Sequence, residues 1–298
     1  MKVISYTESP AWPGFFLCVD KKKLRWYNIF MTSEEKLKNK KLFLMDMDGT
    51  VYIDDRLLPG AKEYIERARE KGKAVFMTNN SSRGISSYLE KMAKLGIEAS
   101  EDDFLTSVDA LIHYLENSYG PGAGEMKIFV CGTASFRKQL ADSGFRITDV
   151  YEKDVDMAVL GFDRELTYRK LEDLSRILNE KPEITYLAAN PDWVCPGEHG
   201  PVPDCGSMAQ MIEHTTGRLP VFMGKPEPLM AEMALERYGY SREEALVIGD
   251  RIYTDIACGV NAGIDTAFVL SGEGTLEDIV RFGIEPTYIF NSIKEILI

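Results

Sequence analysis

The sequence has 298 residues, 45% of them hydrophobic, which is enough for one large or two modest globular domains with a sizeable core. Its formal net charge of −12 at pH 7 repels polyanions and argues against nucleic acid as the main partner. No apolar run approaches the roughly 18 to 20 residues of a membrane-crossing helix, and residues 14–19 are too short for a typical secretory signal. We therefore predict a cytoplasmic protein with no membrane partner.

Residues 1–40 lack the pattern of the rest of the chain and form an N-terminal extension of uncertain status. They are rich in aromatic residues and show no clear periodicity. Two hypotheses stay open. Either translation begins at Met31 and the preceding residues are an extension or start-site artefact, or residues 1–30 are a genuine arm that docks on the domain. A peptide from residues 1–30 in cell extract would rule out the first.

From residue 41 onward, short apolar runs alternate with amphipathic stretches, which is typical of a mostly parallel sheet covered by helices. The predicted strands are 42–46, 74–78, 127–131, 157–161, 184–188, 245–249, 266–270 and 287–290. The predicted helices are 61–72, 85–96, 229–239 and 255–263, and several of them end at a glycine that permits a left-handed cap. The fold class indicated is α/β, with a doubly wound, mostly parallel sheet.

Two segments interrupt this alternation. Residues 119–125 are rich in glycine and proline and are typical of a linker or hinge. Residues 190–206 form a long turn-rich stretch with four prolines, more than a plain connection needs.

The five cysteines are scattered, odd in number and without a Cys-x-x-Cys pair, so we expect reduced thiols rather than a disulfide framework. They are Cys18, Cys131, Cys195, Cys205 and Cys258. Cys205 could be proposed as a nucleophile, but none of the three histidines lies in a recognisable partner motif. We favour a buried structural role for Cys205.

Four polar clusters follow apolar stretches, three of them predicted strands and one the short run 221–223. They are Asp46-x-Asp48-Gly49-Thr50, Thr78-Asn79-Asn80-Ser81-Ser82, Gly224-Lys225-Pro226, and Gly249-Asp250-Arg251-x-x-Thr254-Asp255. Ligands bind at the carboxyl ends of the strands in doubly wound sheets. We therefore expect all four clusters to face one crevice.

The charges in these clusters indicate phosphate chemistry. Four acids at close range need a counter-charge, and Mg²⁺ accepts carboxylates while leaving positions for water and phosphate oxygens. The four acids are Asp46, Asp48, Asp250 and Asp255. Lys225 adds a positive charge and Thr78 a hydroxyl, and an anion could be held by the backbone amides of Gly49, Thr50 and Asn79.

Two of the acids have complementary parts in such a reaction. A carboxylate can attack phosphorus to form an aspartyl-phosphate, which splits one hard hydrolysis into two easier steps. A second acid then protonates the leaving alcohol and later deprotonates the attacking water. Asp46 and Asp48 suit these two roles, because residues two apart at a strand end can converge on one substrate atom.

These residues resemble the haloacid dehalogenase-like hydrolase superfamily, and within it the NagD-like, p-nitrophenylphosphatase-type branch. The match runs from about residue 41 to the C-terminus and is carried by four ordered motifs. They read "DMDGTVY", "FMTNNSSR", "GKPEP" and "GDRIYTDIACGVNAG", with "AANPD" and "PDCGS" supporting the branch.

The resemblance implies a Rossmann-like core and Mg²⁺-dependent hydrolysis of phosphomonoesters. Asp46 would be the nucleophile and a metal ligand, and Asp48 the general acid/base that also gives a backbone carbonyl to the metal. Asp250 would be the third protein ligand of the metal, with Asp255 holding Asp250 or a metal-bound water. Thr78 and Lys225 would grip the phosphoryl oxygens, with Lys225 also orienting Asp46. We further expect substrate contacts from Gly49, Thr50, Asn79 and Asn80.

Spacing then places an inserted α/β cap domain. The 31 residues between Asp46 and Thr78 are too few for a cap, whereas the 146 between Thr78 and Lys225 have room for one. We expect a catalytic core over 41–120 and 219–298 and a cap over 121–218 that closes over the crevice and selects the leaving group. Asn190, Asp192 and Trp193 are candidates for the rim that meets substrate, although a purely turn-forming role is an equal alternative.

Other polar residues near the motifs have plainer explanations. Thr50 and Ser82 could be helix caps. Asp54, Asp55 and Arg56 are expected to form a turn after the first strand. Glu227 and Arg251 are expected to support the site from outside or to lie on the surface.

Other classes of protein explain these motifs less well than a phosphatase does. A haloacid dehalogenase usually lacks the second acid, so Asp48 argues against it, and the related phosphomutases carry their cap between the first two motifs. A phospho-accepting signalling domain also uses clustered Asp, Mg²⁺ and Lys, but is near 120 residues and has no large cap. A catalytically silent binding protein would have no reason to keep every part.

The partner expected from the sequence is a small phosphorylated metabolite. Nucleoside monophosphates, sugar phosphates and damaged or toxic small phosphates all suit a polar cap, and p-nitrophenyl phosphate is the expected test substrate. The physiological substrate is left open. Oligomeric state is also open, with a homodimer formed through the cap as the working hypothesis.

Overall fold

The computed structural model describes residues 36–197 and 199–298. Both hypotheses about residues 1–30, and the prediction of a reduced Cys18, therefore lie outside the described residues. Residues 40–296 form one compact unit, and all the sheets reported below belong to it.

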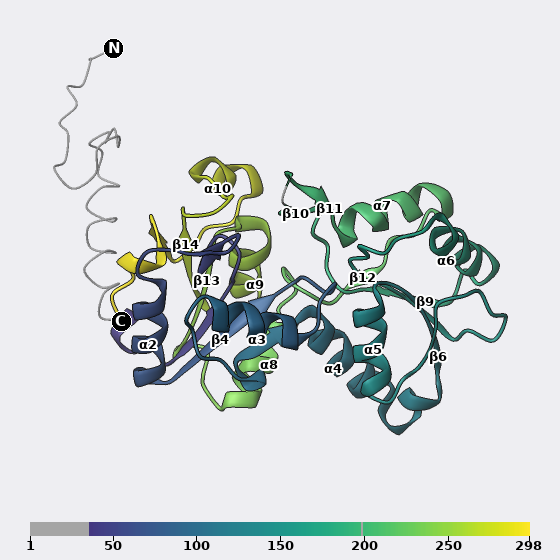
Figure 1. Cartoon of the computed structure of the whole chain (residues 1–298), viewed down its shortest axis with the longest axis horizontal. Coiled ribbons are helices and arrows are strands. Elements are labelled where there is room, and N and C mark those ends of the chain that lie inside the picture. The colour runs from purple at the N-terminus through teal and green to yellow at the C-terminus, as the bar shows by residue number, and fades with distance from the viewer. Residues whose placement is uncertain (1–35, 198) are drawn as a thin grey trace, which may run out of the picture. The chain divides into compact units, whose positions relative to one another are not determined.

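The first sheet has six strands in the order β15-β14-β13-β1-β4-β5, and each neighbouring pair is parallel. In this order the strands are Tyr288–Phe290, Asp265–Val269, Ala245–Gly249, Leu42–Met45, Lys73–Thr78 and Phe104–Thr106. Strand β1 lies between β13 and β4, and its Leu44 is in register with Val247 of β13 and with Val75 of β4. In Figure 1 the purple, blue, green and yellow strands lie together, so segments that are far apart in the sequence are neighbours in this sheet.

The second sheet has five parallel strands in the order β12-β9-β8-β6-β7. They are Val221–Phe222, Thr185–Ala188, Met157–Leu160, Lys127–Cys131 and Arg146–Thr148. Two short antiparallel hairpins complete the strands, β2–β3 (Tyr52–Ile53 and Arg56–Leu57) and β10–β11 (Val194–Cys195 and Val202–Pro203). The first hairpin contains the turn predicted at Asp54.

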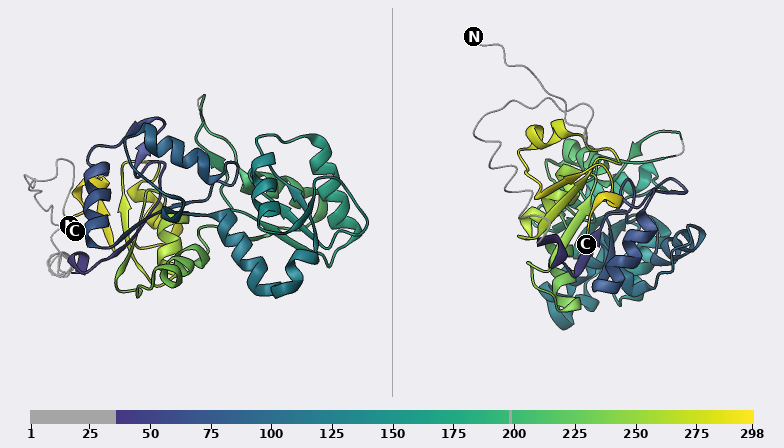
Figure 2. Two further views of the ribbon diagram at one scale, coloured as in Figure 1. Left: turned by 60° about the horizontal axis from the view of Figure 1, so that its bottom comes forward. Right: turned by 90° about the vertical axis from the view of Figure 1, so that its left-hand side faces the viewer.

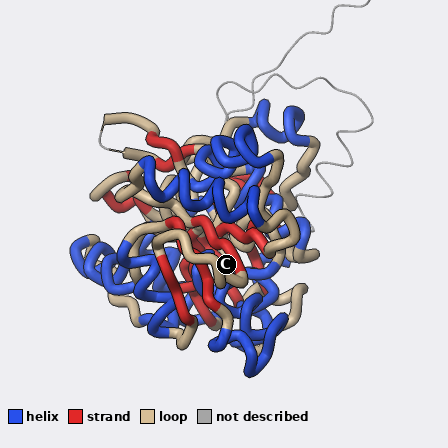
Figure 3. Tube along the Cα trace, turned by 90° about the vertical axis from the view of Figure 1, so that its right-hand side faces the viewer, coloured by secondary structure: helices blue, strands red, loops and turns tan. Residues whose placement is uncertain are grey.

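Helices flank the strands on both sides, as Figures 2 and 3 show. With the first sheet lie α2 (Ala61–Lys71), α3 (Ile85–Lys94), α4 (Ser107–Tyr119), α8 (Leu229–Tyr238), α9 (Ala257–Asn261) and α10 (Leu276–Phe282). With the second lie α5 (Ala134–Asp142), α6 (Tyr168–Glu180) and α7 (Cys205–Thr216). Short 3₁₀ helices span Glu101–Asp103, Gly120–Glu125 and Ile293–Glu295, and a π-helical turn spans Ile252–Ile256. None of the described helices is both long and apolar enough to cross a membrane.

The central strands explain why the sequence pattern was readable. All four residues of β1 and all five of β13 are buried, since helices cover both faces of the sheet. One face packs Leu44, Val75 and Val247 against α4, α8 and α9, and on the other Phe43 meets Tyr64 of α2 edge to face. Burial on both faces produces the continuous apolar runs from which these strands were predicted.

The predicted α/β class is confirmed, and so are all eight predicted strands and the helices predicted at 61–72, 85–96 and 229–239. The helix predicted at 255–263 begins instead as the π-helical turn and continues as α9. Residues 119–125 are not an open linker, because most of them form the 3₁₀ helix Gly120–Glu125. The proposed boundaries at 121 and 218 stay a prediction; β12 of the second sheet lies just after residue 218.

Candidate active site

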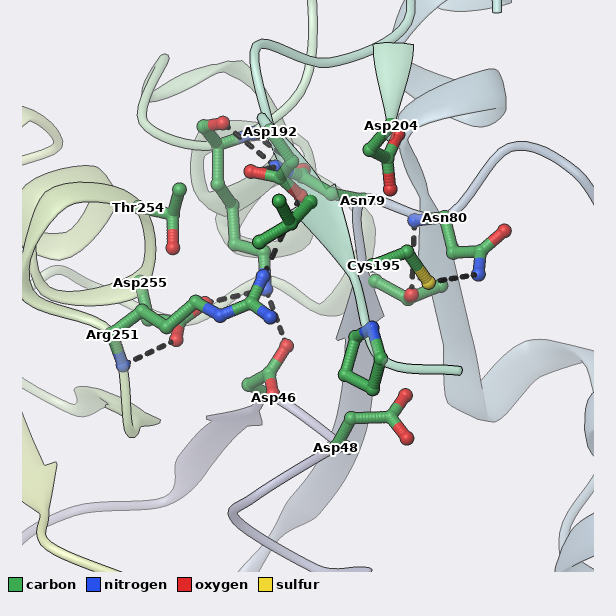
Figure 4. A pocket seen from close by; sticks show the side chains of 14 residues that line it. Asp46, Asp48, Asn79, Asn80, Asp192, Cys195, Asp204, Arg251, Thr254 and Asp255 are labelled. Carbon is green, nitrogen blue, oxygen red and sulfur yellow. Dashed lines mark hydrogen bonds and ion pairs between the residues drawn. The ribbon is translucent and has the colours of Figure 1, made fainter. Parts of the chain in front are cut away.

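Members of all four predicted polar clusters line one pocket at the carboxyl ends of β1, β4 and β13. The lining residues are Asp46, Asp48, Thr78, Asn79, Asn80, Asp192, Val194, Cys195, Pro196, Asp204, Lys225, Arg251, Thr254 and Asp255. Figure 4 shows Asp255, Thr254 and Arg251 on one side of this pocket and Asp204, Cys195 and Asn80 on the other. The parallel sheet brings these residues together because its strands all end at the same edge.

Lys225 is a buried cation at the base of the pocket, with a side chain only 3% exposed. Its Nζ donates to Asp46 Oδ1 at 2.7 Å, to Asp255 Oδ1 at 2.6 Å and to the Met77 carbonyl at 3.3 Å. Burial opposes the charge, but the Asp255 and Asp46 carboxylates outweigh it and raise the pKa of Lys225. Lys225 therefore stays charged and fixes one oxygen of Asp46.

Three of the four predicted acids form a tight cluster. Asp46, Asp250 and Asp255 each offer a carboxylate oxygen, and these oxygens lie within 4.8 Å of one another. Burial, followed by repulsion from Asp255, raises the pKa of Asp46, although Lys225 opposes the shift. The same two causes raise the pKa of Asp250 to about 7. The cluster is thus short of positive charge even with Lys225 in place.

The surroundings of Asp250 fit a divalent cation. Its Oδ2 accepts a hydrogen bond from the Glu273 amide at 2.8 Å, while its Oδ1 is buried without a hydrogen-bond partner among the described residues. A Cβ added to Gly49 or Gly272 would lie 2.5 Å or 1.9 Å from Asp250 Oδ2, so the backbone presses closely around the carboxylate. A buried, unpaired carboxylate oxygen beside two further carboxylates is the donor set that Mg²⁺ prefers.

Asp48 lies apart from this cluster, toward the pocket opening, and its side chain is 45% exposed. Its carboxylate accepts a long hydrogen bond from the Tyr52 hydroxyl at 3.4 Å, and Lys91 Nζ of α3 lies 3.9 Å away. Partial loss of solvation raises the pKa of Asp48, opposed first by the charge of Lys91 and then by that of Arg251. A carboxyl group whose pKa is raised, close to solvent, suits proton exchange better than metal ligation.

The motif after β4 is held by its own hydrogen bonds. Thr78 is 5% exposed and its Oγ1 accepts from the Asn80 amide at 3.2 Å. The Asn80 side chain accepts from the amide and hydroxyl of Ser82, at 2.9 Å and 2.7 Å. Both Thr78 and Asn80 line the pocket, whereas Ser82 holds the loop and is not the helix cap that we considered, because Gly84 is the N-cap residue of α3.

The amide cradle expected at Gly49 and Thr50 is not formed in this structure. The Gly49 amide donates to the Tyr52 carbonyl at 2.8 Å, and the Thr50 amide points to the Met47 carbonyl at 3.3 Å. Gly49 has a φ of 91° and lies against Asp250, which explains the glycine by packing and turn geometry. Neither residue lines the pocket, because the chain turns at this point into the β2–β3 hairpin.

The turn-rich segment 190–206 contributes a wall of the pocket, and of its three predicted rim residues only Asp192 lines that pocket. Asn190 is fully buried; it donates to the Asn79 carbonyl at 2.7 Å and accepts from the Asp192 amide at 3.0 Å. Asn190 is thus a turn-forming residue, and Trp193 is 54% exposed and outside the lining. Asp192 does line the pocket, where burial raises its pKa to about 6 against the opposing charge of Arg251.

Several residues that line the pocket were not predicted from the sequence. Arg251 was expected to lie outside the site, yet its guanidinium faces Asp192 at 3.9 Å and pairs with Glu273 at 3.0 Å. Cys195, at the end of β10, and Asp204, directly after β11, also line the pocket. Arg251 and Asp204 could have been found from their places inside the quoted motifs "GDRIYTDIACGVNAG" and "PDCGS", whereas Cys195 lies in none of the quoted motifs.

Cys205 carries out the structural role preferred for it. The side chain is fully buried at the start of α7, and its Sγ faces the Leu160 carbonyl at 3.6 Å. Burial raises the pKa of the thiol well above its usual value, which keeps it protonated and unreactive.

Comparisons with known proteins agree with this fold and site. A family model described as haloacid dehalogenase-like hydrolase matches residues 43–146, and a second, described as HAD-hydrolase-like, matches residues 222–296. The acid sugar phosphatase of Staphylococcus aureus is 34% identical over 260 residues, covering 87% of this chain and 97% of that protein.

Solved structures extend the agreement to three dimensions. The 4-nitrophenylphosphatase of Thermotoga maritima superimposes with a TM-score of 0.80 at 38% identity, covering 87% of this chain and 97% of the other. The glycerol phosphate phosphatase of Mycobacterium tuberculosis, solved in complex with magnesium, gives a TM-score of 0.80 at 29% identity, covering 88% and 77%.

The chain therefore belongs to the haloacid dehalogenase-like hydrolases. Within that family it is a phosphatase of the NagD-like, 4-nitrophenylphosphatase type, as the sequence motifs predicted.

Proposed function

We propose that this phosphatase is a Mg²⁺-dependent phosphomonoester hydrolase that acts on small phosphorylated metabolites through an aspartyl-phosphate at Asp46. The observation that carries the proposal is the arrangement around Lys225. One cation bridges Asp46 and Asp255 at 2.7 Å and 2.6 Å, beside the unpaired oxygen of Asp250, in a pocket that Asp48 also lines.

In the first half-reaction, Asp46 attacks phosphorus with the carboxylate oxygen that Lys225 does not hold. The bond from phosphorus to the leaving oxygen breaks, and Asp48 gives its proton to that oxygen. Asp46 is well placed for attack because its Oδ1 is fixed by Lys225, which leaves Oδ2 as the nucleophile. The raised pKa of Asp48 favours the protonated form that this step needs.

In the second half-reaction, the now ionised Asp48 takes a proton from water, and the resulting hydroxide attacks phosphorus. The bond between phosphorus and Asp46 breaks, which regenerates the carboxylate and releases inorganic phosphate. Lys225 and the Thr78 hydroxyl hold phosphoryl oxygens during both steps.

Asp46, Asp250 and the Asp48 carbonyl would hold the magnesium ion, with Asp255 holding Lys225 and supporting Asp250. When bound, the ion supplies positive charge that offsets the repulsion between the carboxylates and the phosphoryl group.

The walls of the pocket favour small, hydroxyl-bearing leaving groups. Asp192, Asp204 and Asn80 present polar groups on the wall that lies opposite the catalytic acids. The names of the relatives, an acid sugar phosphatase and a glycerol phosphate phosphatase, point in the same direction. A cytoplasmic location and a cap-mediated homodimer remain predictions.

The proposal is tested with purified protein and p-nitrophenyl phosphate. We expect hydrolysis with Mg²⁺, its loss with EDTA and recovery on adding Mg²⁺ back. Asp46→Asn should abolish turnover, and Asp48→Asn should lose steady-state turnover. Unchanged turnover in Asp46→Asn would remove Asp46 as the nucleophile. A panel of phosphate monoesters ranked by kcat/KM then identifies the leaving group.

A further inference from the structure

Asn79 makes a two-point contact with the backbone of Lys225, a residue 146 positions further along the chain. Its Oδ1 accepts from the Lys225 amide at 2.8 Å, and its Nδ2 donates to the Lys225 carbonyl at 2.8 Å. The Lys225 amide can only donate and the carbonyl only accept, so the pair also fixes which end of the Asn79 side chain carries the nitrogen. An asparagine holding both backbone groups of one residue mimics a strand pairing at that residue.

The surroundings leave the Asn79 side chain no other position. It is 5% exposed, and a Cβ added to Gly224 would lie 2.5 Å from its Oδ1. Its Nδ2 donates a second time, to Asp192 Oδ1 at 3.2 Å. Although Asn79 lines the pocket, both polar atoms of its side chain are therefore engaged within the protein, which argues against the substrate contact predicted for this side chain.

We propose that Asn79 is a positioning residue that acts through Lys225: it fixes the Lys225 backbone so that Nζ reaches Asp46 and Asp255 together. This rests on the proposed function, in which Lys225 orients Asp46 and the phosphoryl oxygens. The lysine side chain has four rotatable bonds, and its Nζ must meet both carboxylates within hydrogen-bonding distance. A fixed backbone removes the largest remaining source of misplacement, and displacement by about 1 Å can cost about 100-fold in rate.

The test is a double-mutant cycle on Asn79 and Lys225 with p-nitrophenyl phosphate and saturating Mg²⁺. Asn79→Ala should lower kcat by about 10- to 100-fold and leave KM within about threefold, because the side chain aligns the reacting groups and does not bind substrate. In the Lys225→Ala background, Asn79→Ala should lower kcat by less than about twofold, because the residue it positions is already gone.

A matched control comes from helix α9, which contacts the residue after Lys225. Asn261, an exposed residue, donates from Nδ2 to the carbonyl of Pro226 at 2.9 Å, next to Lys225. Asn261→Ala should change kcat by less than about twofold. A loss in Asn261→Ala equal to that in Asn79→Ala would mean that every tether on this loop matters equally, which contradicts a specific role for Asn79.

Other outcomes also decide the matter. A KM that rises while kcat is kept in Asn79→Ala would make Asn79 a substrate ligand, and equal losses in both backgrounds would show that it acts independently of Lys225. If Asn79→Ala does not fold, Asn79→Asp carries the same cycle, since it keeps the acceptor for the Lys225 amide and lacks the donor to the carbonyl. Full activity in Lys225→Ala would instead refute the role of Lys225 in the proposed function, whereas full activity in Asn79→Ala alone refutes only this inference.

Discussion

At the scale of single residues, the two acids of the first motif lie in different electrostatic settings although only one residue separates them. Asp46 faces inward to Lys225 and the other acids, and Asp48 faces outward to Lys91 and Tyr52. This separation gives one carboxylate a fixed geometry and the other access to solvent, which a nucleophile and a proton donor respectively need.

Lys91 should set the pH range in which Asp48 works. Its positive charge lowers the pKa of Asp48, so Lys91→Met should raise that pKa and keep Asp48 protonated to higher pH. The alkaline limb of kcat/KM should move upward by a few tenths to about one pH unit, because the pair is partly exposed to solvent. Lys94→Met, an exposed lysine on the same helix, is the control and should leave the profile in place. A downward shift in Lys91→Met would contradict the assignment.

At the scale of elements, helix α7 begins with a carboxylate that solvent does not reach. Asp204 is 3% exposed and caps the helix by accepting from the Cys205 amide. Burial, and then the neighbouring Asp192, raises the pKa of Asp204 to about 7. A folded-state pKa above the unfolded value of about 3.9 means that the folded protein loses stability as pH rises between the two values.

Asp204→Asn should therefore stabilise the protein at alkaline pH. Asparagine keeps the N-cap acceptor and removes the buried charge, so the gain at pH 8 should be on the order of 1–3 kcal/mol. Near pH 4 the gain should vanish, because Asp204 is then protonated in the folded state. Urea unfolding at the two pH values measures the difference. A variant that is less stable than the parent at pH 8 would show that the ionised carboxylate contributes favourable contacts.

The element scale also shows where sequence reasoning succeeds and where it stops. The long strands were predictable because burial on both faces demands continuous apolar residues, as in β1 and β13. Helix α4 was missed although Thr106 and Asp109 form a capping box at its start. Strands of two or three residues, such as β5 and β12, carry too few residues for a period to be read.

The candidate site follows the same rule. Three of the four motifs could be placed because they follow readable strands, and the Lys225 motif because it matches the family's order of motifs; members of all four meet in one pocket. Cys195 could not be placed, since its position depends on how the β10–β11 hairpin folds over the sheet edge. The direction of the Arg251 side chain depends on the π-helical turn that follows this residue. From the sequence we expected an ordinary helix there.

At the scale of the whole molecule, the buried acids should couple metal binding to stability. The protein carries a net charge of −12, and Asp46, Asp250 and Asp255 concentrate part of it in one buried cluster. A cation that binds only the folded chain stabilises it by about 2.7 kcal/mol when its free concentration is about 100 times Kd.

Saturating Mg²⁺ should therefore raise the Tm by several degrees over the value in EDTA at pH 8. Asp250→Asn should lose most of this rise, because the unpaired oxygen that faces the cluster no longer belongs to a charged group. Differential scanning fluorimetry with NaCl of equal ionic strength controls for screening. An equal rise in the variant and the parent would mean that Mg²⁺ binds elsewhere.

The backbone around Lys225 limits how this enzyme can be re-engineered. Met223 and Gly224 donate to the carbonyls of Ala188 and Ala189, so the chain leaves the second sheet only as it reaches Lys225. An exchange of the segment 121–218 for that of a relative would cut between α7 and β12, so the incoming sheet would have to pair with an edge strand from the other parent. A chimera designed to change substrate preference should therefore carry its donor sequence through Phe222 and keep Asn79 and Lys225 from the same parent.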